Sequence, residues 1–302
     1  MSAPRRVALV GATASGKSAA AHAAALASGG TEIVSLDAMS AYKGMDLGTA
    51  KPTVEARREV PYHLIDVVEA SEEMTVQAYQ ARCAEALVEI DERHATALLV
   101  GGSGLYVRAV VDELEIPPHD PAIRRALEDE ARAPGGLEAL RAELVATDPV
   151  AAARIDPRND RRVVRALEVV RTTGRPFSSF AAELTSYPDR GVAMLGIAFD
   201  PVRTDAAIAA RFAAWMEAGL LEEVRGLLAA PGGLSRTARQ AAGYRQLIAH
   251  LEDDVALDVA VADAVTATRR LARRQWRWFR RDPRIRWVSD HDEARRALDE
   301  LL

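Results

Sequence analysis

Short apolar runs recur along the first third of the chain, and each ends at glycine or aspartate. Continuous apolar runs are typical of strands buried on both faces, whereas the alanine-rich stretches between them have helical composition. Strands that alternate with helices predict a parallel sheet flanked by helices. The predicted strands are residues 7–10, 33–36 and 97–100, and the predicted helices are residues 18–28 and 76–93.

From Pro117 the pattern changes to helical segments rich in alanine, arginine and glutamate, separated by prolines and glycines. Strand character returns at residues 192–199, and helices then continue to the end of the chain. This order predicts an α/β core interrupted by a helical insertion. We place the core at residues 1–118 and 187–302, and the insertion at residues 119–186.

The composition fits a globular protein, since 49% of the 302 residues are hydrophobic and 27% are charged. Glycines and Lys17 interrupt the first apolar run, so we expect neither a signal peptide nor a membrane span, and a cytoplasmic location. The single cysteine, Cys83, excludes an internal disulfide and a cysteine-built zinc site. Nothing in the sequence indicates a protein partner, and we expect a monomer.

A phosphate-binding loop of the pattern GxxxxGK[ST] follows the first predicted strand and precedes the first predicted helix. Its glycines let the backbone wrap an anion, the lysine supplies charge, and the final hydroxyl can reach Mg²⁺. The motif predicts a bound diphosphate or triphosphate, against the alternative of a glycine-rich turn with an exposed lysine. The loop consists of Gly11, Ala12, Thr13, Ala14, Ser15, Gly16, Lys17 and Ser18.

ATP is the default ligand for this motif, but one feature of the sequence weakens that assignment. Many nucleotide hydrolases carry a carboxylate on a neighbouring strand, but the run 98–100 ends in glycines and Ser103 with no acid.

The net charge is −5, yet residues 269–286 hold nine arginines against one acid, Asp282. On a helix, the seven arginines up to Arg281 fall within an arc of roughly 140°. This basic face predicts a polyanionic partner rather than a stripe paired with acids elsewhere.

Several strings along nearly the whole chain resemble those of tRNA dimethylallyltransferases (tRNA isopentenyltransferases). They occur in the same order as in that family, which makes them far more specific than the loop alone. The strings are GATASGKS at 11–18, DAMSAYKGMDLGTAKP at 37–52, PYHLID at 61–66, LLVGGSGLY at 98–106, DPVAAARIDPRNDRRVVRALEV at 148–169, GYRQ at 243–246 and TRRLARRQWRWF at 268–279.

The resemblance implies a P-loop, nucleotide-kinase-like core and a specific reaction. A five-carbon prenyl group passes from dimethylallyl diphosphate to the exocyclic amine of the adenosine 3′ of the anticodon in tRNA. The loop then holds a leaving diphosphate, with Lys17 and an Mg²⁺ held partly by Ser18 acting where negative charge grows. Arg211 stands upstream of a match to MxxGLxxEV and is the candidate for a second diphosphate contact; the alternative is a solvated helix arginine.

The resemblance places the general base at Asp37, at the end of the second predicted strand, although an isolated aspartate there is more often a helix cap or an ion-pair partner. Ser103 matches a hydroxyl residue near the modified base, and it could equally cap the next helix. The implied tRNA contacts are Asp37, Ala38, Met39, Ser40, Ser103, Asp160, Arg161, Arg162, Val163, Val164, Gln240, Gly243, Tyr244 and Arg245.

The chain departs from the family around the base. The family commonly has DSxQxY, whereas this chain has Ala38 and Ser40 and retains Tyr42. Base selectivity is therefore less well defined than reaction class. Because the target amine is stacked in an anticodon loop, we expect the nucleotide to be extruded into a channel between the two domains. The competing hypotheses are a small-molecule or nucleotide kinase, an enzyme that prenylates free adenine nucleotides, and a non-enzymatic RNA-binding protein.

Overall fold

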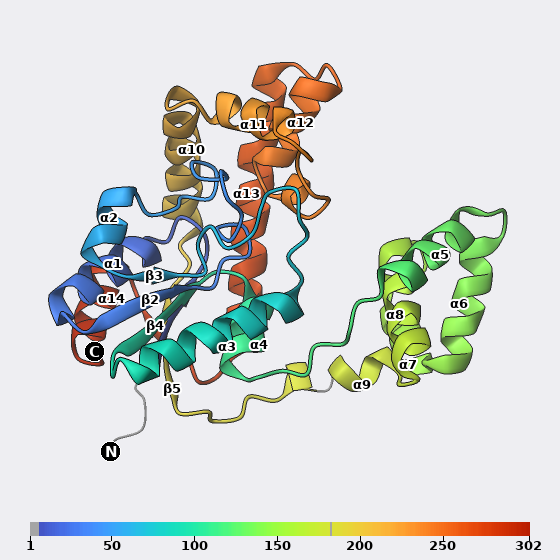
Figure 1. Cartoon of the computed structure of the whole chain (residues 1–302), viewed down its shortest axis with the longest axis horizontal. Coiled ribbons are helices and arrows are strands. Elements are labelled where there is room, and N and C mark those ends of the chain that lie inside the picture. Colours follow the sequence, from blue (N-terminus) through green and yellow to red (C-terminus); the bar gives the residue numbers. More distant parts are fainter. Residues whose placement is uncertain (1–5, 182) are drawn as a thin grey trace. The chain divides into compact units, whose positions relative to one another are not determined.

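The computed structural model describes residues 6–181 and 183–302. Residues 1–5, which belong to the segment where no signal peptide is expected, lie outside the described residues. The chain forms two compact units, a core unit of Met1–Val111 with Asp189–Leu302 and a helical unit of Asp112–Pro188 (Figure 1). The expected insertion, residues 119–186, falls within the second unit.

The core unit contains a parallel sheet with the strand order β3-β2-β4-β1-β5-β6. The four strands predicted from apolar runs are all present. The two edge strands were not predicted, because segments of two and three residues carry too little pattern to identify. The strands are β1 (Arg6–Gly11), β2 (Thr31–Ser35), β3 (Tyr62–His63), β4 (Thr96–Gly101), β5 (Val192–Ile197) and β6 (Arg286–Val288).

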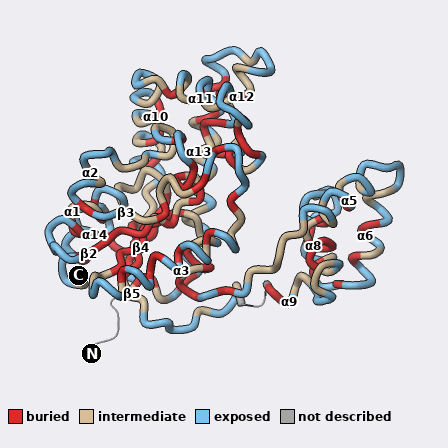
Figure 2. The backbone as a smooth tube through the Cα atoms, in the orientation of Figure 1, coloured by how far each residue is buried: buried red, intermediate tan, exposed pale blue. Residues whose placement is uncertain are grey.

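Helices cover both faces of the sheet, as expected for strands that are apolar throughout. Along β1, Val7 and Leu9 pack with helices α1 (Lys17–Ser28) and α14 (His291–Asp299). The alternate residues Ala8 and Val10 belong to the opposite core, with α3 (Val76–Glu92), α4 (Gly104–Val111) and α13 (Leu257–Phe279). Buried positions accordingly follow the strands and the inner sides of the helices (Figure 2).

The described part of the core unit also contains four further helices and a 3₁₀ turn. None of the helices within residues 6–181 and 183–302 is long and apolar enough to cross a lipid bilayer. These elements are α2 (Val54–Glu59), α10 (Pro201–Glu217), α11 (Leu220–Ala229), α12 (Tyr244–Glu252) and the 3₁₀ turn Ala238–Gln240.

The helical unit has a small apolar core of its own, which includes Leu127, Leu144 and Leu167. One fully buried acid, Glu168, accepts hydrogen bonds from His119, the Asp120 amide and Arg124 and is paired with Arg165. This network satisfies the buried carboxylate. The helices are α5 (Pro121–Arg132), α6 (Gly136–Thr147), α7 (Pro149–Arg154), α8 (Asp160–Thr173) and α9 (Phe177–Ala181), with a 3₁₀ turn at Glu183–Thr185.

Candidate active site

The predicted phosphate loop connects β1 to the first residue of α1. Gly16 has φ 87° and Ala14 has φ 62°, so the loop passes twice through the left-handed region. No side chain caps the start of α1, and its first turn contains no acid. The Ser15 hydroxyl is buried and has no hydrogen-bond partner among the described residues. A helix N-terminus with unoccupied N–H groups and no neighbouring carboxylate is suited to hold an anion.

Two cavities open beside this loop, of about 350 Å³ for the first and about 320 Å³ for the second. They have a common wall, and all the residues that line them belong to the core unit. The channel that the sequence predicts between the two domains stays a prediction. The common wall consists of Thr13, Lys17, Asp37, Thr49, Ala50 and Arg211.

The common wall contains two cations, Lys17 and Arg211, and one carboxylate, Asp37. Burial of the Lys17 ammonium lowers its pKa to about 8; the Asp37 carboxylate partly opposes this shift and the Arg211 guanidinium adds to it. Burial also lowers the pKa of Arg211, which lies 5.7 Å from the ring centroid of Trp215 and has no ion-pair partner among the described residues. Two buried cations that share a single carboxylate indicate a site prepared for an anion that the protein itself does not supply.

Asp37 follows β2 and is held by its own loop. Its Oδ1 accepts a hydrogen bond of 2.9 Å from the Met39 amide, and its backbone carbonyl accepts one of 3.0 Å from the Ser40 hydroxyl. No helix begins near it, since α2 starts at Val54, and it has no ion pair among the described residues. Neither of the ordinary structural roles for a strand-end aspartate therefore accounts for its position in the common wall.

The departures from the family pattern change the surface beside Asp37. Ala38 and Met39 line the second cavity, so an apolar surface stands there. Ser40 lines the first cavity instead, and its hydroxyl is 2.8 Å from the Ser35 hydroxyl. The Ser40 hydroxyl is thus hydrogen-bonded to Ser35 and Asp37, and it does not line the second cavity.

The second cavity also includes Ser103, which follows β4. The Ser103 carbonyl accepts the Val107 amide in the first turn of α4, while its hydroxyl has no hydrogen bond among the described residues. The hydroxyl is therefore not used as a helix cap. Trp215, Gln240 and Arg274 lie in the same cavity wall.

Gln275 of α13 is a site residue that the sequence reading did not identify. Its Oε1 accepts a hydrogen bond of 2.8 Å from the Thr13 amide in the phosphate loop. Its Nε2 fills the space beside Gly102, where an added Cβ would be only 2.7 Å away. The available signal was a lone amide four residues after Leu271, on the apolar face of an otherwise basic helix.

Two of the residues predicted to contact RNA near residue 243, Gly243 and Tyr244, are buried and pack within the core unit. The Tyr244 hydroxyl donates to Glu223, and its ring packs on Gly48, where an added Cβ would be 2.5 Å from the ring. Arg245 is exposed but does not line either cavity. Tyr244 thus supports the loop that supplies Thr49 and Ala50 to the common wall.

The basic face of α13 is partly neutralised. Asp205 pairs with Arg273 at 2.7 Å and with Arg269 at 3.9 Å, whereas Arg274 is exposed at the second cavity without an ion pair among the described residues.

The helix predicted to continue to Arg281 is two residues too long, because α13 ends at Phe279. The neighbouring aromatic residues are core as expected: Phe279 is buried, Trp276 packs against Phe199 and Trp287, and Trp278 lies against Gly104.

In the helical unit, the predicted RNA-contacting segment begins α8. Asp160, Arg161 and Arg162 are exposed, and neither arginine has an ion pair among the described residues. Val163 and Val164 are 1% and 2% exposed and form part of the unit's apolar core. Only the first three side chains of the segment are therefore available to a ligand.

Comparisons with known proteins agree with this geometry. A family model described as IPP transferase matches residues 40–282. A tRNA dimethylallyltransferase of Streptomyces coelicolor is 45% identical over 301 residues, covering 99% of this chain and 95% of that protein. A full-length tRNA isopentenylpyrophosphate transferase from Bacillus halodurans is 34% identical, with a TM-score of 0.68 over 99% of this chain and 95% of that one. A eukaryotic dimethylallyltransferase solved acting on tRNA shares the fold at a TM-score of 0.77, with 22% identity and coverage of 96% and 75%.

Proposed function

Because the chain belongs to the tRNA dimethylallyltransferase family, we propose that it transfers a dimethylallyl group from dimethylallyl diphosphate to the N6 amine of the adenosine 3′ of the anticodon, releasing diphosphate. The observation that carries this proposal is the composition of the common wall between the two cavities. It contains two buried cations, Lys17 and Arg211, and one carboxylate, Asp37. Family membership also favours this transfer over the small-molecule or nucleotide kinase.

The donor diphosphate occupies the first cavity at the start of α1. Breaking the allylic carbon–oxygen bond leaves its electron pair, and hence negative charge, on diphosphate. The loop amides, Lys17 and Arg211 stabilise that charge where it develops. The charges of Lys17 and Arg211 are available to the diphosphate because Asp37 is the only acid in the common wall.

Mg²⁺ fits the oxygen donors of this site. No group of three His, Cys, Asp or Glu side chains able to hold a metal occurs within the described part of the chain. Mg²⁺ needs few protein ligands when substrate phosphates and water supply the rest. The exposed Ser18 hydroxyl in the first cavity is the residue that would hold it. The bound ion would neutralise charge on the diphosphate.

The acceptor adenine enters from the second cavity, extruded from the anticodon loop. The amine nitrogen forms the new bond to the allylic carbon and becomes acidic as it does so. Asp37 then accepts its proton, and the Ser103 hydroxyl is placed to bind the base. The apolar surface of Ala38 and Met39 provides shape and packing rather than hydrogen-bond recognition.

We assign RNA binding to Arg274 of α13 and to Arg161 and Arg162 of the helical unit, which are exposed and have no ion pair among the described residues. Arg274→Ala should weaken binding of an anticodon stem-loop about three- to tenfold and reduce the slope of log K against log salt by about one. Arg286→Ala is the matched control, since Arg286 lies in the same arginine-rich segment but is paired with Glu300. Equal slopes for Arg274→Ala and wild type, measured by anisotropy titration, would remove Arg274 from the RNA interface.

One assay distinguishes the proposed transfer from its rivals. The protein is incubated with Mg²⁺, labelled dimethylallyl diphosphate and an unmodified anticodon stem-loop, beside parallel reactions with AMP or ATP. We expect label in the RNA and in neither nucleotide, without ATP turnover. Label in AMP would indicate an enzyme acting on free nucleotides, and ATP consumption without prenyl transfer would indicate a kinase.

A further inference from the structure

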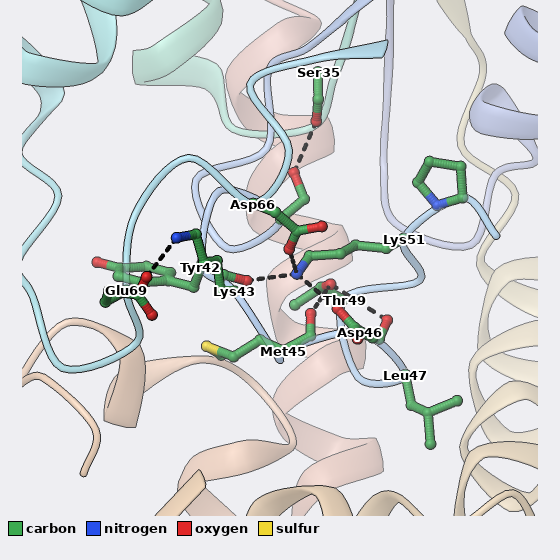
Figure 3. Close-up of polar contacts among 12 residues, drawn as sticks. Ser35, Tyr42, Lys43, Met45, Asp46, Leu47, Thr49, Lys51, Asp66 and Glu69 are labelled. Carbon is green, nitrogen blue, oxygen red and sulfur yellow. Dashed lines mark hydrogen bonds and ion pairs between the residues drawn. The ribbon is translucent and has the colours of Figure 1, made fainter. Parts of the chain in front are cut away.

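The loop that supplies Thr49 and Ala50 to the common wall is organised around one buried lysine. The side chain of Lys51 is 1% exposed. Its ammonium donates to the Tyr42 carbonyl, to Asp46 Oδ1 at 2.8 Å and to Asp66 Oδ1 at 2.6 Å (Figure 3). Its three N–H groups thus have three acceptors from three separate points of the chain.

Backbone strain is concentrated around the same ammonium. Ala50, Leu64 and Asp66 have φ values of 54°, 62° and 56°, a region that residues with a Cβ adopt at an energetic cost. Ala50 adjoins Lys51, and Asp66 is one of its acceptors. Such conformations persist only where the surrounding contacts enforce them. The Lys51 bonds are the contacts that join the two strained segments.

The other end of this loop has an independent anchor. Glu223 of α11 accepts the amides of Asp46 and Leu47 at 3.1 and 2.8 Å. Asp66 is also held by Arg57 at 2.6 Å. Thr49 and Ala50 therefore lie between two fixed points, Glu223 before them and the Lys51 ammonium after them.

We propose that Lys51 is a positioning residue for prenyl transfer: its buried ammonium holds Thr49 and Ala50 in the common wall, and so sets the alignment of the donor carbon with the adenine amine. The inference rests on the proposed function. It assigns Lys51 no contact with the reacting atoms. Loss of the ammonium should affect alignment, and hence kcat, more than the binding of either substrate alone.

Lys43 offers a matched control within the same segment. It is a lysine paired with a glutamate, Glu69, but both side chains are more than half exposed. Exposed pairs of this kind contribute little to structure. Lys43→Met therefore removes the same charge from the same segment without removing a buried contact, and it should leave kcat and both substrate affinities unchanged.

The test measures kcat, the affinity for diphosphate with Mg²⁺, the affinity for an anticodon stem-loop, and the melting temperature. Lys51→Met should lower kcat about 10- to 100-fold, since small misplacements of reacting groups have effects of this size, while both affinities change less than about threefold. Adding Ala50→Gly should recover part of that kcat, because glycine adopts the left-handed conformation without the ammonium.

Three outcomes would overturn the proposal: wild-type kcat in folded Lys51→Met, losses of affinity as large as the loss of kcat, or no recovery of kcat on adding Ala50→Gly. If Lys51→Met does not fold, Asp46→Ala removes only the more exposed acceptor and should lower kcat about three- to tenfold; an unchanged kcat in this variant would also overturn it. An inactive wild-type protein would instead contradict the proposed function itself.

Discussion

Replacement of Asp37 with asparagine should lower the rate of prenyl transfer by about 10²- to 10⁴-fold, the range expected for loss of a general base. Asparagine keeps the shape of the side chain and an oxygen that can accept the Met39 amide, so the loop should keep its conformation. Only the ability to take a proton is removed. Single-turnover transfer to an anticodon stem-loop, with RNA binding measured separately, checks the prediction.

The appropriate control is Asp200→Asn. Asp200 has the structural role that an aspartate in such a position usually has: it caps α10, and its Oδ1 accepts the amides of Val202 and Arg203. Asparagine is also a good helix cap, so activity and stability should stay near wild type. If Asp37→Asn weakened RNA binding as much as it slowed transfer, Asp37 would be a binding residue and the base would lie elsewhere.

Replacement of Lys17 with methionine should lower kcat/KM for dimethylallyl diphosphate by about 10²- to 10³-fold, because the charge that meets the leaving group is lost. The same change should raise the melting temperature of the free protein near pH 7. Burial lowers the pKa of Lys17 to about 8, so at pH 7 the folded protein carries a charge that burial disfavours. Lys43→Met, which removes an exposed lysine, should alter neither quantity.

The pH dependence of both effects has a definite sign. Below pH 8 Lys17 is charged in the folded and the unfolded chain, so the stability gain of Lys17→Met is fully present. Between pH 8 and 10.5 the folded wild type releases the proton, and the gain shrinks. Diphosphate binding by wild type should also weaken above pH 8, by up to about tenfold per unit, because binding favours the charged lysine.

Calorimetric titration with diphosphate and Mg²⁺ from pH 7 to 9.5, beside thermal melts of both proteins, tests these signs. The methionine variant should bind weakly and show no break near pH 8. Affinity in wild type that stays constant across this range would mean that the Lys17 charge does not contribute to diphosphate binding. A lower melting temperature for the variant at pH 7 would contradict the burial cost.

The chain's own pattern was sufficient for the central strands and the phosphate loop. Strands such as β1 are buried on both faces, so burial requires a continuous apolar run, and the run ends where the phosphate loop begins. The loop is local as well, since eight consecutive residues supply its backbone, its lysine and its hydroxyl. These features depend on neighbours within a few residues, and local patterns record them.

The environment of those residues was decided only by tertiary packing. Arg211 reaches Lys17 because α10 runs past the phosphate loop, Gln275 reaches Thr13 across 262 positions of the chain, and Asp205 neutralises part of the basic face of α13. The sequence predicted seven arginines on one face but not which of them remain unpaired. Distances between remote segments depend on how whole elements pack, and composition, periodicity and spacing do not encode that arrangement locally.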